Sequence, residues 1–312
     1  MESKHCLLCP RHCGVNRTAG ERGYCGESAT LRLAAASIHR GEEPPVSGTG
    51  GSGAIFVSGC NLGCAFCQNY QISHKGMGRE VAITEFVAIC LQLQALGAEN
   101  INIVTGTHAI PAIVAGLKQA RAGGLVIPTL WNSSAYESLE ALSLLDDVID
   151  VYLPDLKTLD PNLAAHFFNA PDYPEYATKA ILRMLDTRAL RASASSTLTS
   201  GVIIRHLVLP GYLEATRKTL RWFAEHCQGR ALISVMTQYT LPRGMDMRVK
   251  DAPKRFMSEQ DYETVLGWLE EFGIEDGFYQ ELTPDSDWLP DFTRQNPFSS
   301  TLSTAVWHFQ SP

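Results

Sequence analysis

The chain has 312 residues, of which 45% are hydrophobic and 19% charged, so it is long enough for a full hydrophobic core and does not have the composition of a disordered polypeptide. Its 26 Lys and Arg residues against 33 Asp and Glu residues give a formal net charge of −7, which argues against a general nucleic-acid binder. The first residues do not resemble a signal peptide, and no apolar run of about 18 residues follows, so we expect a cytoplasmic protein that does not enter a membrane.

The N-terminal part of the chain differs in composition from the rest. We predict a Cys-rich segment and linker over residues 1–53 and the main domain over residues 54–312. Residues 41–53 are rich in Gly, Pro and Ser, which predicts a loop or hairpin between the two parts. Nine cysteines in a reducing compartment indicate metal ligands, rather than disulfides, wherever they cluster.

From residue 54 onward, strand-like and helix-like patterns alternate. Apolar runs predict strands at 54–59, 101–106, 125–131, 148–157, 201–210 and 231–239. Helical periodicity predicts helices at 84–97, 112–121, 134–145, 213–227 and 258–273, with further helical segments between 161 and 187. Six such units form a curled parallel sheet but are too few for a closed eight-fold barrel. The fold class is therefore α/β, a partial (β/α)6 barrel with its site at the carboxyl ends of the strands.

Capping signals mark several of these helices. Thr84 is the predicted N-cap of the helix at 84–97. Ser134, with Glu137 three residues later, predicts a capping box at the start of the helix at 134–145. Gly273 is the predicted end of the last helix.

The sequence GCNLGCAFCQNY at residues 59–70 directly follows the first predicted strand. It places Cys60, Cys64 and Cys67 in a C-x3-C-x2-C pattern. A [4Fe–4S] cube normally takes one thiolate per iron, so three cysteines leave one iron open to an exchangeable ligand. The alternative is a zinc site whose fourth ligand is His74 or another residue.

This cysteine spacing, on the loop after a first barrel strand, resembles that of the radical S-adenosylmethionine (SAM) superfamily. The resemblance implies a [4Fe–4S] cluster on Cys60, Cys64 and Cys67, with SAM chelated by the open iron. It implies reductive cleavage of SAM to methionine and a 5′-deoxyadenosyl radical that abstracts hydrogen. Phe66 is then expected to pack on the adenine, Asn69 belongs to the cofactor-binding set, and a flavodoxin or ferredoxin is the implied electron donor.

Further segments narrow the resemblance to the activating enzymes of glycyl radical enzymes. CLLCPRHCGVNR, GCNLGCAFCQNY, WNSSAYE, VYLPDLK and IRHLVLPG together resemble a subgroup called pyruvate formate-lyase activating enzyme-like, over nearly the whole chain. Two positions depart from the activase pattern. Gln68 stands where activases carry His, and TGTHAIP at 105–111 replaces the GGEP-type motif that contacts the SAM amino group. Thr105, Thr107 or His108 is expected to substitute for the missing Glu.

Charged residues on two predicted strands are further candidates. Asp155 and Lys157 end the fourth strand and share one face of it, because side chains alternate along a strand. We expect Lys157 to reach the SAM carboxylate and Asp155 to bind a ribose hydroxyl or a cation, although a surface ion pair is the alternative. Arg205 and His206 point to opposite faces of the fifth strand, so at most one of them faces the barrel interior.

Four cysteines near the N-terminus form a second group. Cys6, Cys9, Cys13 and Cys25 have the spacing C-x2-C-x3-C-x11-C, which is typical of metal ligands. They predict either a second iron–sulfur cluster that relays electrons or a structural zinc ion. The basic residues around them could form a solvated face or dock an acidic electron donor; these are Arg11, His12, Arg17 and Arg22.

Three functions remain open at this level. The first is a radical SAM enzyme that abstracts hydrogen from a protein or peptide, as an activase does. The second is a radical SAM enzyme that acts on a small metabolite. The third is a metal-binding protein without catalytic activity.

Overall fold

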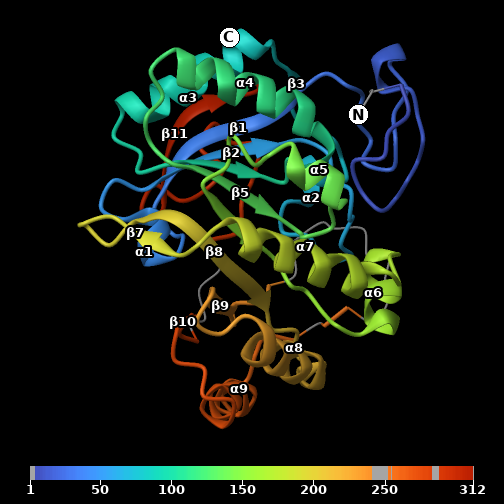
Figure 1. The fold of residues 1–312 in the computed structure, drawn as a ribbon, viewed down its shortest axis with the longest axis vertical. Coiled ribbons are helices and arrows are strands. Elements are labelled where there is room, and N and C mark those ends of the chain that lie inside the picture. Colours follow the sequence, from blue (N-terminus) through green and yellow to red (C-terminus); the bar gives the residue numbers. More distant parts are fainter. Residues whose placement is uncertain (1–3, 241–251, 254, 283–287, 312) are drawn as a thin grey trace.

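The computed structural model describes residues 4–240, 252–253, 255–282 and 288–311. Its centre is a curved, open sheet of strands in the order β10-β9-β8-β6-β5-β4-β2-β1-β11 (Figure 1). Neighbours from β2 to β10 in this order pair in parallel. Their bounds are β2 (Ser52–Val57), β4 (Ile101–Val104), β5 (Thr129–Ser133), β6 (Val151–Pro154), β8 (Leu198–Leu207), β9 (Leu232–Met236) and β10 (Gly277–Tyr279).

The parallel strands are short and mostly apolar. Every residue of β2, β4 and β6 is buried, as expected for strands that are covered on both faces. The partial barrel predicted from the alternating pattern is confirmed. β10, which the sequence did not predict, adds one more parallel strand beyond β9.

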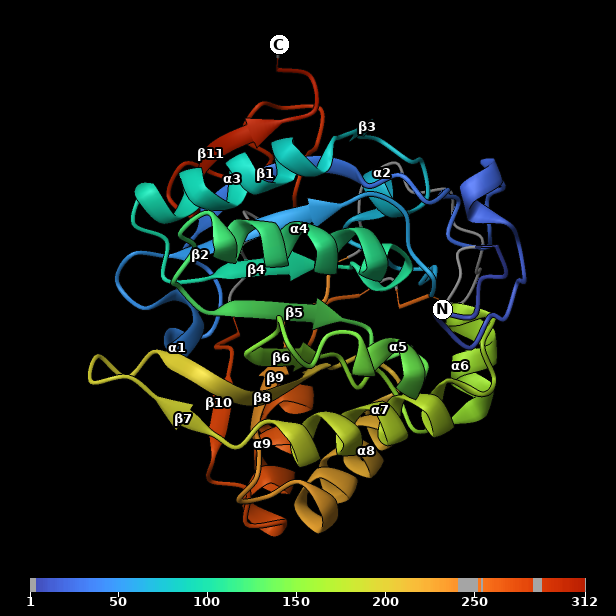
Figure 2. The same cartoon turned by 45° about the horizontal axis from the view of Figure 1, so that its top comes forward.

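Helices cover the outside of the curved sheet, with α3 and α4 over one half and α7 and α8 over the other (Figures 1 and 2). The longer helices are α3 (Ile83–Ala95), α4 (Ile110–Ala122), α5 (Leu139–Ser143), α6 (Pro161–Phe168), α7 (Tyr173–Thr187), α8 (Leu213–His226) and α9 (Glu259–Glu271). Short turns of helix are η1 (Arg17–Ala19), α1 (Pro44–Ser47), α2 (Tyr70–Ser73) and η2 (Thr107–Ala109).

Two predicted helix starts are wrong. Helix α3 begins at Ile83, and its N-cap Ala82 has no side-chain cap. Helix α5 begins at Leu139 instead of near Ser134, and the Ser138 hydroxyl accepts from the Ala141 amide at 3.2 Å. The residues before α5 turn into the core instead of starting a helix, with Ala135 in the left-handed region at φ 56°.

Four antiparallel strands escaped the sequence analysis: β1 (Arg32–His39), β3 (Arg79–Glu80), β7 (Arg191–Ala192) and β11 (Ser303–His308). β1 pairs with β2 on one side and with β11 on the other. The predicted boundary between residues 53 and 54 falls inside β2, so one sheet runs across it. No helix in the part of the chain that the structure describes is long and apolar enough to cross a bilayer.

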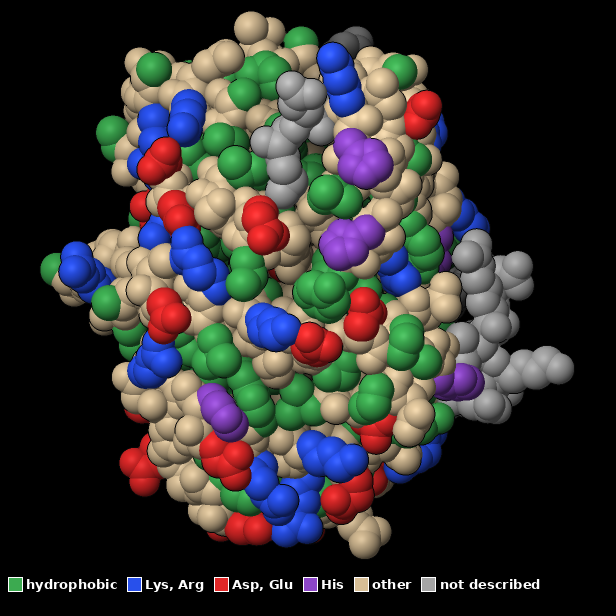
Figure 3. Space-filling model, turned by 45° about the vertical axis from the view of Figure 1, so that its right-hand side comes forward, with side chains coloured by type: hydrophobic (Ala, Val, Ile, Leu, Met, Phe, Trp, Pro, Cys, Tyr) green, Lys and Arg blue, Asp and Glu red, His purple; other side chains and the backbone are tan. Residues whose placement is uncertain are grey.

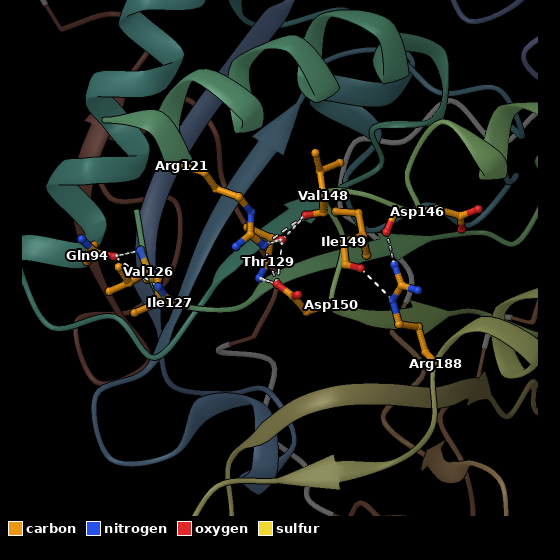
Figure 4. Close-up of polar contacts among 10 residues, drawn as sticks. All are labelled: Gln94, Arg121, Val126, Ile127, Thr129, Asp146, Val148, Ile149, Asp150 and Arg188. Atoms are coloured by element: carbon orange, nitrogen blue, oxygen red, sulfur yellow. Dashed lines mark hydrogen bonds and ion pairs between the residues drawn. The ribbon is translucent and has the colours of Figure 1, made fainter. Parts of the chain in front are cut away.

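Polar contacts tie the amino ends of β5 and β6 to α4 (Figure 4). The Asp150 carboxylate accepts from the Thr129 amide at 2.8 Å and from the Arg121 guanidinium at 2.7 Å. The Arg188 guanidinium donates to the carbonyls of Ile149 and Asp146, at 2.8 and 2.5 Å. These contacts lie at the end of the sheet opposite the carboxyl ends of the parallel strands, where structural residues are expected.

Candidate active site

The carboxyl ends of the parallel strands point toward the N-terminal segment, which we define as residues 4–31, and toward α6 (Figure 2). A cavity of about 610 Å³ lies at this end of the sheet. Its volume is in the range of cofactor and substrate pockets. Of the nine residues predicted for the catalytic cluster and SAM, all except Thr107 line it, namely Cys60, Cys64, Phe66, Cys67, Asn69, Thr105, Asp155 and Lys157, whereas the four N-terminal cysteines do not.

Three thiols face this cavity from the three-cysteine loop, residues 59–70. Cys64 is buried, and Cys60 and Cys67 are half-buried. Burial raises the pKa of Cys67 to about 11 and also raises that of Cys64, while the Lys157 ammonium opposes both shifts. Metal binding requires deprotonated thiols, so a bound cluster and this cation would favour the same thiolate state.

The three-cysteine loop offers three thiols to a metal group. A [4Fe–4S] cube binds each thiolate through a different iron, so these three thiols fit such a cluster and leave one iron without a protein ligand. A single zinc ion would need a fourth ligand. Among the described residues, no group of three or more His, Cys, Asp or Glu side chains is found that could hold a metal ion.

Aromatic packing fixes Phe66 beside the cysteines. Its ring contacts Phe167, Phe168 and Tyr239 edge-on, at centroid distances of 5.4, 6.0 and 5.9 Å. Edge-to-face contacts at these distances are favourable. Phe66 still lines the cavity, so it is placed for the adenine contact that the resemblance implies.

The end of β6 brings two opposite charges into the cavity. Lys157 Nζ lies 2.7 Å from Asp155 Oδ2, and the two side chains are 19% and 24% exposed. Burial alone would lower the pKa of Lys157, but the Asp155 carboxylate raises it above its usual value, so the ammonium is charged. The Tyr173 hydroxyl donates to the Asp155 carbonyl at 2.7 Å and accepts from the Lys157 amide at 3.0 Å, which holds this turn in place.

The segment after β4 separates the three candidates for the missing Glu. Thr105 lines the cavity in the left-handed region, with φ 63°. Thr107 is 1% exposed and donates to Glu137 Oε1 at 2.8 Å, away from the cavity. His108 is also buried, and its Nε2 donates to the Ser58 carbonyl at 2.7 Å. The structure therefore brings Thr105 to the site and leaves Thr107 and His108 in the core.

Glu42 and Arg205 line the cavity beside β8, and the sequence analysis missed Glu42 and its neighbour Glu43. Glu42 and Glu43 both contact the Arg205 guanidinium, with Arg205 Nε 2.9 Å from Glu43. Burial alone would raise the pKa of Glu43, but Arg205 holds it below its usual value. His206 faces the other way, between the Leu156 carbonyl at 2.7 Å and the Thr216 hydroxyl at 2.9 Å, as the strand alternation predicted. A buried Arg needs an acidic partner. The adjacent glutamates of the predicted linker were therefore the sequence signal that could have identified this cluster.

The N-terminal segment lies against the three-cysteine loop. The Arg11 guanidinium donates to the carbonyls of Asn61 and Leu62 at 3.0 Å each and to that of Phe168 at 2.8 Å. It also lies 3.8 Å from the centre of the Tyr24 ring, a favourable cation–π distance.

The four basic residues of the predicted cluster differ in their exposure and in their partners. Arg11 is occupied by backbone carbonyls, and Arg17 is 4% exposed and donates to the carbonyls of Ser28 and His108. Only His12 and Arg22 of the four basic residues are exposed. On the face of the molecule that Figure 3 shows, basic and acidic side chains are interspersed.

Two known proteins are similar to this chain in sequence. The uncharacterized protein MJ0674 of Methanocaldococcus jannaschii is 27% identical over 280 residues, which cover 87% of this chain and 76% of that protein. The 7-carboxy-7-deazaguanine synthase of Rhodopirellula baltica is 24% identical over 253 residues, which cover 80% of this chain and 83% of that protein.

A solved structure is similar to this chain in fold, and a family model matches its sequence. Streptococcus suis SuiB bound to S-adenosylmethionine superposes with a TM-score of 0.51 at 14% identity, over 71% of this chain and 48% of SuiB. This chain thus spans about half the length of that structural relative, and the likeness establishes a shared fold. The model of the radical SAM superfamily matches residues 54–223, more than half of the chain. The chain therefore belongs to the radical SAM superfamily.

Proposed function

We propose that this protein reductively cleaves SAM and abstracts hydrogen from a protein or peptide substrate, in the manner of a glycyl radical enzyme activase. The observation that carries the proposal is a single cavity lined by the three thiols, Phe66 and the Asp155–Lys157 pair. When bound, the cluster supplies the electron that breaks the S–C5′ bond of SAM to give methionine and a 5′-deoxyadenosyl radical. The activase-like segments VYLPDLK and IRHLVLPG support a protein or peptide substrate.

The residues of this chain bind and orient SAM. Lys157 offsets the SAM carboxylate, and Asp155, relieved of part of its pairing, accepts from a ribose hydroxyl. Phe66 packs on the adenine, and Asn69 and the Thr105 hydroxyl or carbonyl accept from the SAM ammonium. A neutral acceptor makes a weaker bond than the carboxylate of the activase motif. The position of these groups in a cavity strengthens each interaction by excluding water.

A small-metabolite substrate is the second candidate. Arg205 and Glu42, which form an ion pair, line the same cavity and could bind a polar small molecule. A 7-carboxy-7-deazaguanine synthase, whose name indicates a small product, is among the relatives in sequence. We further propose a cytoplasmic location, which the nine free cysteines support.

A deuterium-transfer screen tests the function. The anaerobically reconstituted protein is given SAM, dithionite and size-separated fractions of deuterated lysate, and 5′-deoxyadenosine is analysed for deuterium. Transfer from the high-mass fraction supports the activase-like function, and transfer from the low-mass fraction supports the metabolite. The matched control is the Cys60→Ala, Cys64→Ala, Cys67→Ala triple variant, which is expected to release no 5′-deoxyadenosine. The absence of 5′-deoxyadenosine from the parent protein, or its release by the triple variant at the parent rate, would reject the proposal.

A further inference from the structure

Two turns of the N-terminal segment carry three of its four cysteines. The first turn carries Cys9 and Cys13, with the His12 amide donating to the Cys9 carbonyl at 3.1 Å. The second carries Cys25, with the Gly26 amide donating to the Gly23 carbonyl at 3.0 Å. Cys13 Sγ lies so close to the second turn that a Cβ at Gly23 would come within 2.7 Å of it. A larger residue at Gly23 would therefore displace the Cys13 thiol.

A buried cation lies beside the sulfurs of this group. The Arg17 guanidinium lies 3.8 Å from Cys6 Sγ. A buried cation stabilises thiolates, and hydrogen bonds to cluster sulfurs adjust the reduction potential.

The sequence spacing of these cysteines favours a cluster over zinc. C-x2-C-x3-C-x11-C contains one C-x2-C pair, whereas zinc ribbons carry two such pairs.

The two cysteine groups are directly connected. The Cys60 amide donates to the Cys25 carbonyl at 3.4 Å, so a single hydrogen bond joins a cysteine of each group. Electron transfer weakens steeply with distance, and this connection is short.

We propose that Cys6, Cys9, Cys13 and Cys25 hold a second [4Fe–4S] cluster that passes electrons to the SAM-cleaving site through the Cys25–Cys60 contact. The role as a relay rests on the proposed function. A low-potential donor such as a flavodoxin or ferredoxin is oxidised by one electron, the second cluster is reduced by it, and the same electron then moves to the cluster at the three-cysteine loop. No bond is made or broken in this step. Cys13 is exposed, so electrons from the donor enter the second cluster on the side of Cys13.

Metal analysis tests the site independently of SAM cleavage. The Cys60→Ala, Cys64→Ala, Cys67→Ala variant is reconstituted anaerobically with iron, sulfide and zinc present. It is expected to retain about four irons per chain, to give the electron paramagnetic resonance signal of one reduced cluster with dithionite, and to hold no zinc. One zinc ion per chain without this signal, or no bound metal at all, would overturn the site.

The relay is tested by changing the reductant. Cys13→Ser is expected to release 5′-deoxyadenosine near the parent rate with dithionite and at least tenfold more slowly with reduced flavodoxin. Cys227→Ala, which removes a buried thiol far along the chain, is the matched control and is expected to keep both rates. A Cys13→Ser protein that is equally fast, or equally slow, with both reductants would overturn the relay. If the parent releases no 5′-deoxyadenosine, the proposed function fails while the metal analysis still decides the site.

Discussion

Lys157 and Asp155 pair with each other in a place where both are largely removed from water. Such a pair gains little stability, because the desolvation of two charges offsets most of their attraction. The proposed function gives the pair a role, because SAM carries both a carboxylate for Lys157 and hydroxyl donors for Asp155.

Lys157→Met is expected to weaken SAM binding by about tenfold or more, because a lost charged contact costs about 1.5–3 kcal/mol. Thr105→Val removes at most a neutral hydrogen bond and is expected to have the smaller effect. Calorimetric titration of SAM into the anaerobic reconstituted variants measures both. Lys118→Met is the control, because Lys118 pairs with Asp147 at an exposed site. Equal affinities for the parent and Lys157→Met would remove Lys157 from the binding site.

His206 makes stability depend on pH. Its Nδ1 donates to the Leu156 carbonyl and its Nε2 accepts from the Thr216 hydroxyl, so the ring is neutral. Burial lowers the pKa of His206 to about 4, from 6.5 in an unfolded chain. The unfolded state therefore binds the proton more readily, and stability is lost as the pH falls from 6.5 to about 4. The loss is expected to reach about 1.4 kcal/mol per pH unit near pH 5.

Urea unfolding of the reconstituted protein between pH 7 and pH 4.5 measures this dependence. His206→Gln is expected to be less stable than the parent at pH 7, because the fit of the ring is lost, but its stability should fall less steeply with pH. His226→Gln, at an exposed histidine, should keep the parent slope. A His206→Gln slope equal to that of the parent would contradict the assignment.

Local sequence patterns predicted some site residues and missed others for a physical reason. Strand alternation predicted that Asp155 and Lys157 share one face, and they do pair, although β6 ends at Pro154 and a turn after it brings them together. The direction of Thr107 depends on the one-turn helix η2 and on Glu137, a hydrogen-bond partner 30 residues away. No local pattern contains that partner, so the resemblance alone could not separate Thr107 from Thr105.

At the scale of elements, Asp150 connects the amino ends of β5 and β6 with α4 (Figure 4). Its carboxylate accepts from the backbone and side chain of Thr129 and from Arg121. Asp150→Ala removes these acceptors and is expected to lower the free energy of unfolding by about 1–3 kcal/mol. The affinity for SAM should stay unchanged, because these contacts lie at the opposite end of the strands.

Urea unfolding and SAM titration of the same preparation separate the two effects. Asp147→Ala, which removes an exposed ion pair with Lys118, is the matched control and should change stability by less than about 0.5 kcal/mol. A loss of SAM affinity with unchanged stability in Asp150→Ala would show that the two ends of the sheet are not independent.

The elements that the sequence predicted are those with local periodicity. Phe86, Ile89, Cys90 and Leu93 repeat at helical spacing in α3, and all four are buried. β1 has no alternating pattern, because nearly all of it is buried between β2 and β11, and its small alanines are weak strand signals. β11 pairs with a strand far away in the sequence, which local patterns do not encode.

At the scale of the whole molecule, Arg205 ties two distant parts of the barrel together. Glu42 and Glu43 follow β1, whereas Arg205 lies on β8, and all three side chains are no more than 15% exposed. Arg205→Met leaves two carboxylates without their cation, and removing one partner of a buried pair costs about 3–5 kcal/mol. The variant is therefore expected to unfold at much lower urea concentration than the parent.

A charge-matched variant separates unpaired charge from lost packing. The triple variant Glu42→Gln, Glu43→Gln, Arg205→Met carries no buried charge at this place. It is expected to recover a large part of the stability that Arg205→Met loses. Arg230→Met, at an exposed pair with Asp186, is the control for loss of a surface cation. An Arg205→Met protein within about 1 kcal/mol of the parent would show that the cluster does not hold the barrel together.

The pairing of β1 with β11 also has a consequence for biosynthesis. β1 leaves the ribosome early, but its outer partner consists of residues 303–308. At roughly 5–20 residues per second, that edge waits for tens of seconds, and an unpaired edge is prone to join another chain. The cysteines of both groups precede β4 in the sequence. Both cysteine groups therefore leave the ribosome long before the sheet receives its last strand.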